Sequence, residues 1–85
     1  MQCFEGDDDG YLAWRSAHLH DGYILNIDEK KHGGTFLHRA NCAKLEVPIR
    51  KGWNLTRYRK CCSTSEASLR EKMRKYPGAT AHGCV

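Results

Sequence analysis

The sequence lacks several signals from which a function could be inferred directly. Its 85 residues include no apolar run near the ~20 residues that cross a bilayer, so no transmembrane helix is expected. The first ten residues, "MQCFEGDDDG", have neither a basic start nor an apolar segment, so they are not expected to be a secretory signal. No P-loop, glycine-rich dinucleotide turn or pair of catalytic carboxylates occurs, which weakens an enzymatic interpretation.

The chain also lacks a Cys-x₂-Cys pair, the strongest sequence signature of zinc binding, although it has five cysteines. Without a secretory signal, we expect a cytoplasmic protein whose cysteines are mostly reduced thiols. The odd number agrees with this expectation, because a disulfide framework uses cysteines in pairs.

Charge is distributed unevenly along the chain. Residues 1–43 hold 4 Lys/Arg and 7 Asp/Glu, whereas residues 44–85 hold 10 and 3, which gives −3 and +7 and agrees with the net charge of +4. The chain is long enough for one domain only. We expect residues 1–10 to be a flexible acidic lead-in and residues 11–85 to form a single small α+β domain.

The pattern of apolar residues predicts the main elements. Near-helical spacing predicts a helix over Tyr11–Leu19, which Asp8 or Asp9 could cap. Two runs rich in branched and aromatic residues, joined by a polar, glycine-rich turn, predict a hairpin of Tyr23–Ile27 with Thr35–Arg39. The run "NLTRYRKCC" is a third strand candidate over residues 54–62.

The region between the hairpin and the third strand is less regular. A helical turn at Ala40–Leu45 is plausible, and Pro48 argues against a central strand there. After the third strand, Ser63 and Glu66 form a capping-box pattern that predicts a helix over Glu66–Tyr76. The resulting α-β-β-β-α order predicts an α+β fold in which two helices pack on a small antiparallel three-stranded sheet.

Cysteine and histidine recur where predicted strands end. Thiolate and imidazole are the donors that zinc prefers, in sets of four. If the C-terminal tail folds back to the end of the sheet, a zinc site could form from Cys42, Cys62, His82 and Cys84, with His38 as a substitute. The alternative is that Cys42 and Cys62 are ordinary buried cysteines and that His38 is a half-buried strand histidine.

The chain after Tyr11 resembles small bacterial domains to which no activity is attached. The pattern is W-x₃-H-x₂-G-Y-x-L-N, then L-H-R-A-x-C, then Y-x-K-x-C. The residues that carry it are Trp14, His18, Asp21-Gly22-Tyr23, Leu25-Asn26, Leu37-His38-Arg39-Ala40, Cys42, Tyr58, Lys60, Cys62, His82 and Cys84. The resemblance implies a Cys-x₂-Cys tail, from which His82-x-Cys84 departs, and it favours Cys62 over Cys61 as the cysteine that faces Cys42.

The basic half combines cations with aromatic side chains. Cations contact phosphates, and aromatic rings stack on bases in single-strand binders. We expect a nucleic-acid-binding surface between the third strand and the last helix, formed by Arg57, Arg59, Lys60, Arg70, Arg74, Lys75 and Trp53. The alternative for Trp53 is a place in the core.

The leading interpretation is therefore a small non-enzymatic binding module whose ligand is nucleic acid. The second is a protein–protein adaptor or subunit, stabilised by zinc, whose basic face meets an acidic protein partner. The third is a small metal- or cysteine-dependent enzyme, which an 85-residue chain gives little room for, because a substrate cleft occupies a few hundred Å³.

Overall fold

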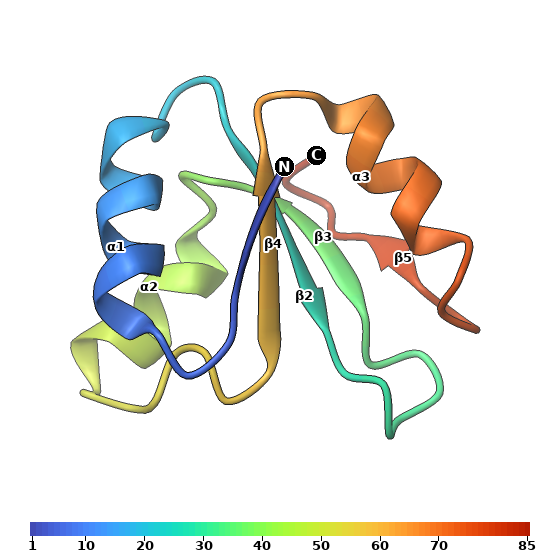
Figure 1. Ribbon diagram of the computed structural model, residues 1–85, viewed down its shortest axis with the longest axis horizontal. Coiled ribbons are helices and arrows are strands. Elements are labelled where there is room, and N and C mark those ends of the chain that lie inside the picture. The colour runs from blue at the N-terminus through green and yellow to red at the C-terminus, as the bar shows by residue number, and fades with distance from the viewer.

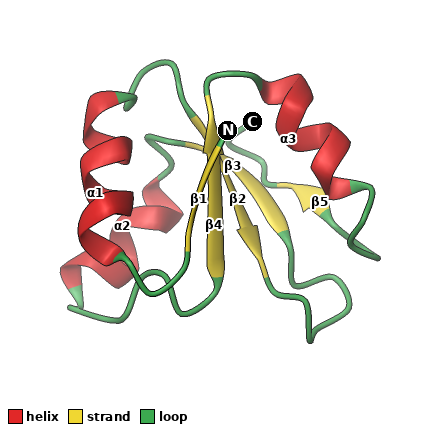
Figure 2. Ribbon diagram, viewed as in Figure 1, coloured by secondary structure: helices red, strands yellow, loops and turns green.

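A five-stranded mixed sheet forms the middle layer of the computed structural model, which describes residues 1–85 (Figure 1). The elements follow in the order β1 (Gln2–Phe4), α1 (Asp8–Ala17), β2 (Tyr23–Ile27), β3 (Phe36–Arg39), α2 (Ala43–Arg50), β4 (Arg59–Ser63), α3 (Glu66–Met73) and β5 (Thr80–Ala81). In space the strand order is β1-β4-β2-β3-β5. Helices α1 and α2 cover one face of the sheet and α3 covers the other (Figure 2).

The expected three-stranded antiparallel sheet with two helices is wrong, although the α+β class is right. The sheet has five strands, the chain has three helices, and β5 runs parallel to β3. The two additional strands are the edges, β1 with three residues and β5 with two. Strands this short carry no readable alternation of apolar and polar residues, so their pairing depends on tertiary contacts.

The local signals predicted the remaining elements. Strands β2 and β3 form the expected antiparallel hairpin, with Tyr23 opposite Arg39. The expected third strand is β4, and it pairs with β2 rather than with β3. The last helix begins at Glu66 as expected, but its cap is Ser65 rather than Ser63, and it ends at Met73 rather than at Tyr76. The Ser65 side chain accepts from Ser68 N–H. The uncertain region contains α2, which includes Pro48.

The acidic N-terminal segment, expected to be a flexible lead-in, takes part in the fold. Gln2–Phe4 pair with β4. Asp7, rather than the expected Asp8 or Asp9, caps α1 by accepting from Gly10 N–H at 2.9 Å, and the helix covers Asp8–Ala17 rather than Tyr11–Leu19. No helix in the structure has the length and the apolar character that crossing a membrane requires.

Two separate apolar clusters fill the spaces on either side of the sheet. One lies under α1 and α2 and includes Tyr11, Ile24 and Cys62. The other lies under α3 and includes Leu25 and Cys61. Neighbouring residues of one strand enter different clusters because successive side chains of a strand point to opposite faces.

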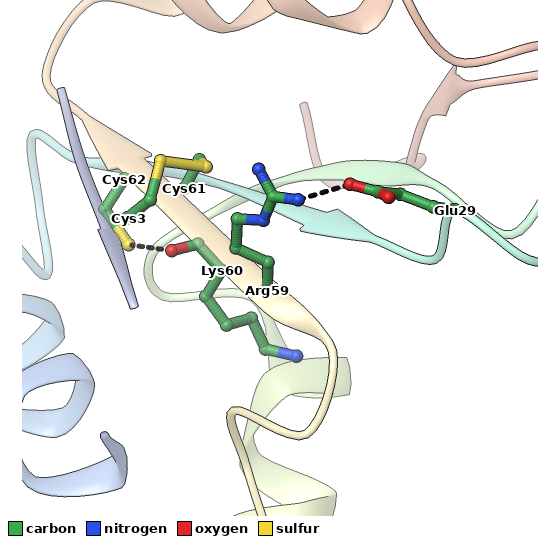
Figure 3. The surroundings of a disulfide bond; sticks show 6 residues. All are labelled: Cys3, Glu29, Arg59, Lys60, Cys61 and Cys62. Carbon is green, nitrogen blue, oxygen red and sulfur yellow. Dashed lines mark hydrogen bonds and ion pairs between the residues drawn. A yellow bond between two sulfur atoms is a disulfide. The ribbon is translucent and has the colours of Figure 1, made fainter. Parts of the chain in front are cut away.

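The N-terminal strand is joined covalently to the sheet. Cys3 lies directly opposite Cys61 in the β1–β4 pair, and the two form a disulfide (Figure 3). The expectation of mostly reduced thiols did not foresee this bond. The three free cysteines are Cys42, Cys62 and Cys84.

Candidate metal centre

Four side chains of the zinc-ligand types converge at one edge of the sheet. The ligand atoms of His38, Cys42, His82 and Cys84 all lie within 4.8 Å of one another. They come from β3, from the residue before α2 and from the tail after β5, segments that are distant in sequence.

The parallel pairing of β3 with β5 brings the two histidines together. Leu37 is opposite Ala81, and His82 N–H donates to the Leu37 carbonyl at 2.8 Å. The next residues along the two strands are His38 and His82, whose ring centroids are 4.9 Å apart. Side chains at matching positions of paired strands emerge on the same face, so both imidazoles point toward the α1 and α2 layer.

A tight turn after β3 places Cys42 beside these rings. Cys42 N–H donates to the Arg39 carbonyl at 3.0 Å, and Cys42 then stands at the N-cap of α2. The turn is fixed from α1, because Arg15 Nε donates to the Ala40 carbonyl at 2.7 Å. A second Arg15 nitrogen forms a 2.8 Å ion pair with Glu46 in α2. Arg15 therefore holds both the turn and the helix that position Cys42.

The tail carries Cys84 back over the start of this turn. Arg39 N–H donates to Cys84 Sγ at 3.4 Å, and Cys84 N–H donates to His82 Nδ1 at 3.2 Å. The His82-x-Cys84 spacing, which departs from Cys-x₂-Cys, thus still places both side chains in the cluster.

One measured separation can be compared directly with zinc geometry. Cys42 Sγ lies 3.6 Å from His82 Nδ1. With Zn–S about 2.3 Å and Zn–N about 2.0–2.1 Å, tetrahedral angles separate a sulfur ligand from a nitrogen ligand by about 3.5 Å. A zinc ion at His82 Nδ1 would replace the long hydrogen bond from Cys84 N–H, and the widest ligand separations would have to close by about 1 Å.

Two of the four candidate ligands are buried, and burial keeps the His38 imidazole in the neutral form that can bind a metal ion. His38 is 8% exposed and Cys42 is 4% exposed. Burial, followed by the electrostatic effect of the neighbouring His82 side chain, lowers the pKa of His38 to about 4, so the His38 imidazole is neutral at pH 7 and keeps a free lone pair. His38 Nδ1 is buried and has no hydrogen-bond partner. Buried polar atoms rarely stay unpaired, and a metal bound to this nitrogen would satisfy it.

The pKa of the Cys84 thiol, in the C-terminal tail, also depends on the surrounding residues. Burial and a hydrogen bond with Cys42 raise the pKa of the Cys84 thiol. A bound zinc ion would oppose both effects, since zinc is ligated by thiolate and a coordinating thiol loses its proton.

Cys62, which the sequence placed in the ligand set, lies outside it. Cys62 and His38 are both opposite Ile24, on either side of β2. They are therefore two strand spacings apart, about 10 Å, and His38 stands in the cluster instead. Burial raises the pKa of the Cys62 thiol to about 12, so Cys62 is a neutral core residue. It does share an apolar cluster with Cys42.

The expected nucleic-acid-binding residues do not form one surface. The side chains of Arg59 and Lys60 leave β4 on opposite faces, as Figure 3 shows, and α3 covers only one of these faces. Three of the predicted cations are paired with carboxylates, in the pairs Arg59–Glu29, Arg70–Glu66 and Arg74–Glu71. Arg57, Lys75 and Trp53 are exposed. Trp53 is thus not a core residue.

Comparison of the chain with models of protein families, with curated proteins and with solved structures finds no match. The case for a function therefore rests on the geometry of the residues described above.

Proposed function

We propose that the protein is a small zinc-binding module in which one Zn²⁺ ion joins β3, the start of α2 and the C-terminal tail. The observation that carries the proposal is the convergence of His38, Cys42, His82 and Cys84 within 4.8 Å. Two thiolates and two imidazoles are a donor set of structural zinc sites, and they disfavour the hard cations Mg²⁺ and Ca²⁺.

The number of ligands supports a structural role for the metal. A catalytic zinc ion has three protein ligands and keeps one position open for water or substrate. Here four protein side chains are available, and filling all four positions leaves no place for a reacting molecule. The proposed function is consequently that of a non-enzymatic binding module.

The role of the zinc ion follows from how weakly the tail is otherwise attached. Strand β5 has two residues, both exposed. Its backbone hydrogen bonds to the neighbouring strand region include Thr80 N–H to the Thr35 carbonyl at 3.1 Å and His82 N–H to the Leu37 carbonyl at 2.8 Å. Each such bond contributes a net ~1 kcal/mol, so the metal would supply most of the free energy that keeps the tail on the sheet.

Zinc binding can be tested with a pair of matched cysteine variants. The protein is purified without a histidine tag, and zinc is measured by mass spectrometry. Cobalt(II) then replaces zinc, because its absorption reports tetrahedral coordination by thiolates. We expect one zinc ion per chain and strong cobalt bands, which Cys84→Ala removes and Cys62→Ala retains.

The control variant removes a thiol that is buried in the same apolar cluster as Cys42 but lies outside the ligand set. Loss of metal in both variants would indicate general unfolding, which circular dichroism would detect. A folded protein that binds no zinc at micromolar concentration would refute the proposal.

A further inference from the structure

A cavity on the α1 and α2 side of the sheet has the composition of a site for an aromatic ligand. Its volume is about 190 Å³, enough for one planar ring system but not for a larger molecule. Trp53 and Tyr58 line it together with Tyr11 and Lys60, and its remaining wall is mainly apolar. The cavity lies away from the proposed metal ligands, none of which lines it.

Two of the aromatic rings that line the cavity are partly exposed to solvent. Trp53 is 56% exposed and Tyr58 is 44% exposed. Each carries a cation near its ring, Lys51 at 5.2 Å and Arg57 at 5.9 Å from the ring centroids. Neither cation lines the cavity. The aromatic walls are therefore flanked by positive charges that remain outside.

The segment that carries these aromatic residues is held in a fixed shape. The Asp8 carboxylate accepts from Leu55 N–H and Thr56 N–H, both at 2.9 Å, and also from the Thr56 hydroxyl. These bonds lower the pKa of Asp8. They anchor the loop before β4 to the first turn of α1, so the cavity is formed before a ligand arrives.

Lys60 is a half-buried cation that forms no direct ion pair, although the charge of Asp8 acts on it from a longer distance. No carboxylate lies within 4.0 Å of its ammonium group, and its one hydrogen bond is to Asn26 Oδ1. Burial lowers the pKa of Lys60 to about 8. An ammonium group has three N–H donors, so two remain for an acceptor that enters the cavity. Figure 3 shows the side chain turning away from the Arg59–Glu29 pair.

We propose that this cavity binds one base of a single-stranded nucleic acid. The base lies against Trp53 and Tyr58, and its carbonyl edge accepts a hydrogen bond from Lys60. The flanking phosphates contact Lys51 and Arg57. This surface keeps Arg57, Lys60 and Trp53 of the set expected from the sequence. It leaves out Lys75 and the three arginines that form ion pairs, Arg59, Arg70 and Arg74.

The chemistry of the cavity also predicts which bases are preferred. Thymine, uracil and guanine offer a ring carbonyl next to their pairing edge, whereas adenine offers an amino group there. A lysine ammonium can only donate. Strands of thymine should therefore bind more tightly than strands of adenine. The acidic residues Asp7 and Asp9 lie beyond Asn54, which borders the cavity, and would repel phosphates on that side.

The test uses zinc-loaded protein and fluorescein-labelled oligonucleotides of twelve thymidines or twelve deoxyadenosines, followed by fluorescence anisotropy in 50 mM salt. We expect tighter binding of the thymidine strand. Trp53→Ala should weaken it by about 5- to 150-fold, since one base–aromatic stack contributes ~1–3 kcal/mol. Lys60→Met should reduce the preference for thymine over adenine. Arg57→Gln should lower the log–log salt slope by about 0.7.

The control is Arg70→Gln with Arg74→Gln on α3, which should change affinity less than twofold. Circular dichroism establishes that each variant is folded. The proposal would be overturned by undetectable binding of both strands, by an affinity that Trp53→Ala leaves unchanged, or by equal weakening in the α3 control. Binding of free thymidine monophosphate as tight as that of the strand would also overturn it. None of these results affects the zinc measurement, so the two proposals fail independently.

Discussion

Reduction of the Cys3–Cys61 disulfide should lower the stability of the protein by a large and calculable amount. The two cysteines are separated by 58 residues, so the bond closes a loop that contains about two thirds of the chain. The chain-entropy relation for a loop of this length gives a loss of about 14 cal/mol/K in the unfolded state, or about 4 kcal/mol at 25 °C. Small domains are typically stable by only 5–15 kcal/mol.

The native state should change little on reduction. Strand β1 keeps its three pairing positions with β4, and Gly6 N–H still donates to the Thr56 carbonyl at 3.0 Å. Cys61 is fully buried and Cys3 is exposed, so the freed Cys61 thiol stays in the core. The loss of stability therefore arises almost entirely from the greater freedom of the unfolded chain.

Guanidinium unfolding of the zinc-loaded protein, with and without a phosphine reductant, measures the effect. With a slope of about 2 kcal/mol/M for a domain of this size, the midpoint should fall by about 2 M. The Cys3→Ser variant serves as a control, because it should match the reduced wild-type protein and should not respond to the reductant. A midpoint that shifts by less than about 0.5 M on reduction and in Cys3→Ser would show that the bond does not restrain the unfolded chain.

Two further changes test other contacts of the fold. Arg15→Met should lower the free energy of unfolding by about 1–3 kcal/mol in urea titrations, because the fully buried Ala40 carbonyl loses its donor; Glu46→Gln, at a 45% exposed side chain, is the milder control. For Lys60, the folded-state pKa of about 8 lies below its ordinary value of 10.5, so the unfolded state binds more protons between these pH values and stability should rise with pH there, by about 2–3 kcal/mol. The Lys60→Met variant should lose this part of the pH dependence of the free energy of unfolding. The difference between the wild-type protein and the variant separates the effect of Lys60 from the opposing ionisation of Cys62 and from the smaller effects of Asp8 and Tyr11. An equal pH dependence of the two proteins would contradict the burial of the ammonium group.

Local signals in the sequence were sufficient for the elements that are stable through local contacts. The β2–β3 hairpin follows from two alternating runs around a glycine-rich turn. Helix α3 was expected from a Ser63–Glu66 capping box and the Glu66–Arg70 pair; the pair is present, but the capping residue is Ser65. Strands β1 and β5 could not be found in this way. Their residues become strands only because β4 and β3 offer free edges, and those edges depend on the complete fold.

The candidate metal site could be predicted only in part, because local signals do not determine the order of the strands. Cys42, His82 and Cys84 lie next to turns, where ligands from different segments can meet, and the sequence placed them together. The choice between His38 and Cys62 required the order of the strands. Because β2 lies between β4 and β3, Cys62 is separated from the cluster by a whole strand. The alternation of side chains along one strand predicts which face of the sheet a residue occupies, but it does not predict which strand lies beside it.

The disulfide, the Arg15–Glu46 ion pair and the proposed zinc site each stabilise a segment that is too short or too irregular to be stable alone. Strand β1 has three residues and is joined to the sheet by a disulfide. Helix α2, with a proline in its eight residues, is tied to α1 by the ion pair of Arg15 with Glu46. Strand β5 has two residues and ends in the proposed zinc ligands. A chain of this size buries too little apolar surface to hold three such segments by packing alone.

The aromatic side chains of residues 53–58 take part in none of these three interactions. Residues 53–58 form no strand or helix, yet Asp8 fixes their backbone while Trp53 and Tyr58 extend into solvent. Partly exposed rings on a rigid backbone leave apolar surface in contact with water, but they lose little entropy when a flat ligand stacks on them. The arrangement is therefore better explained by recognition than by stability. For that reason we place the ligand-binding surface beside α2, away from α3, where Arg70 and the capping residue Arg74 form ion pairs with carboxylates.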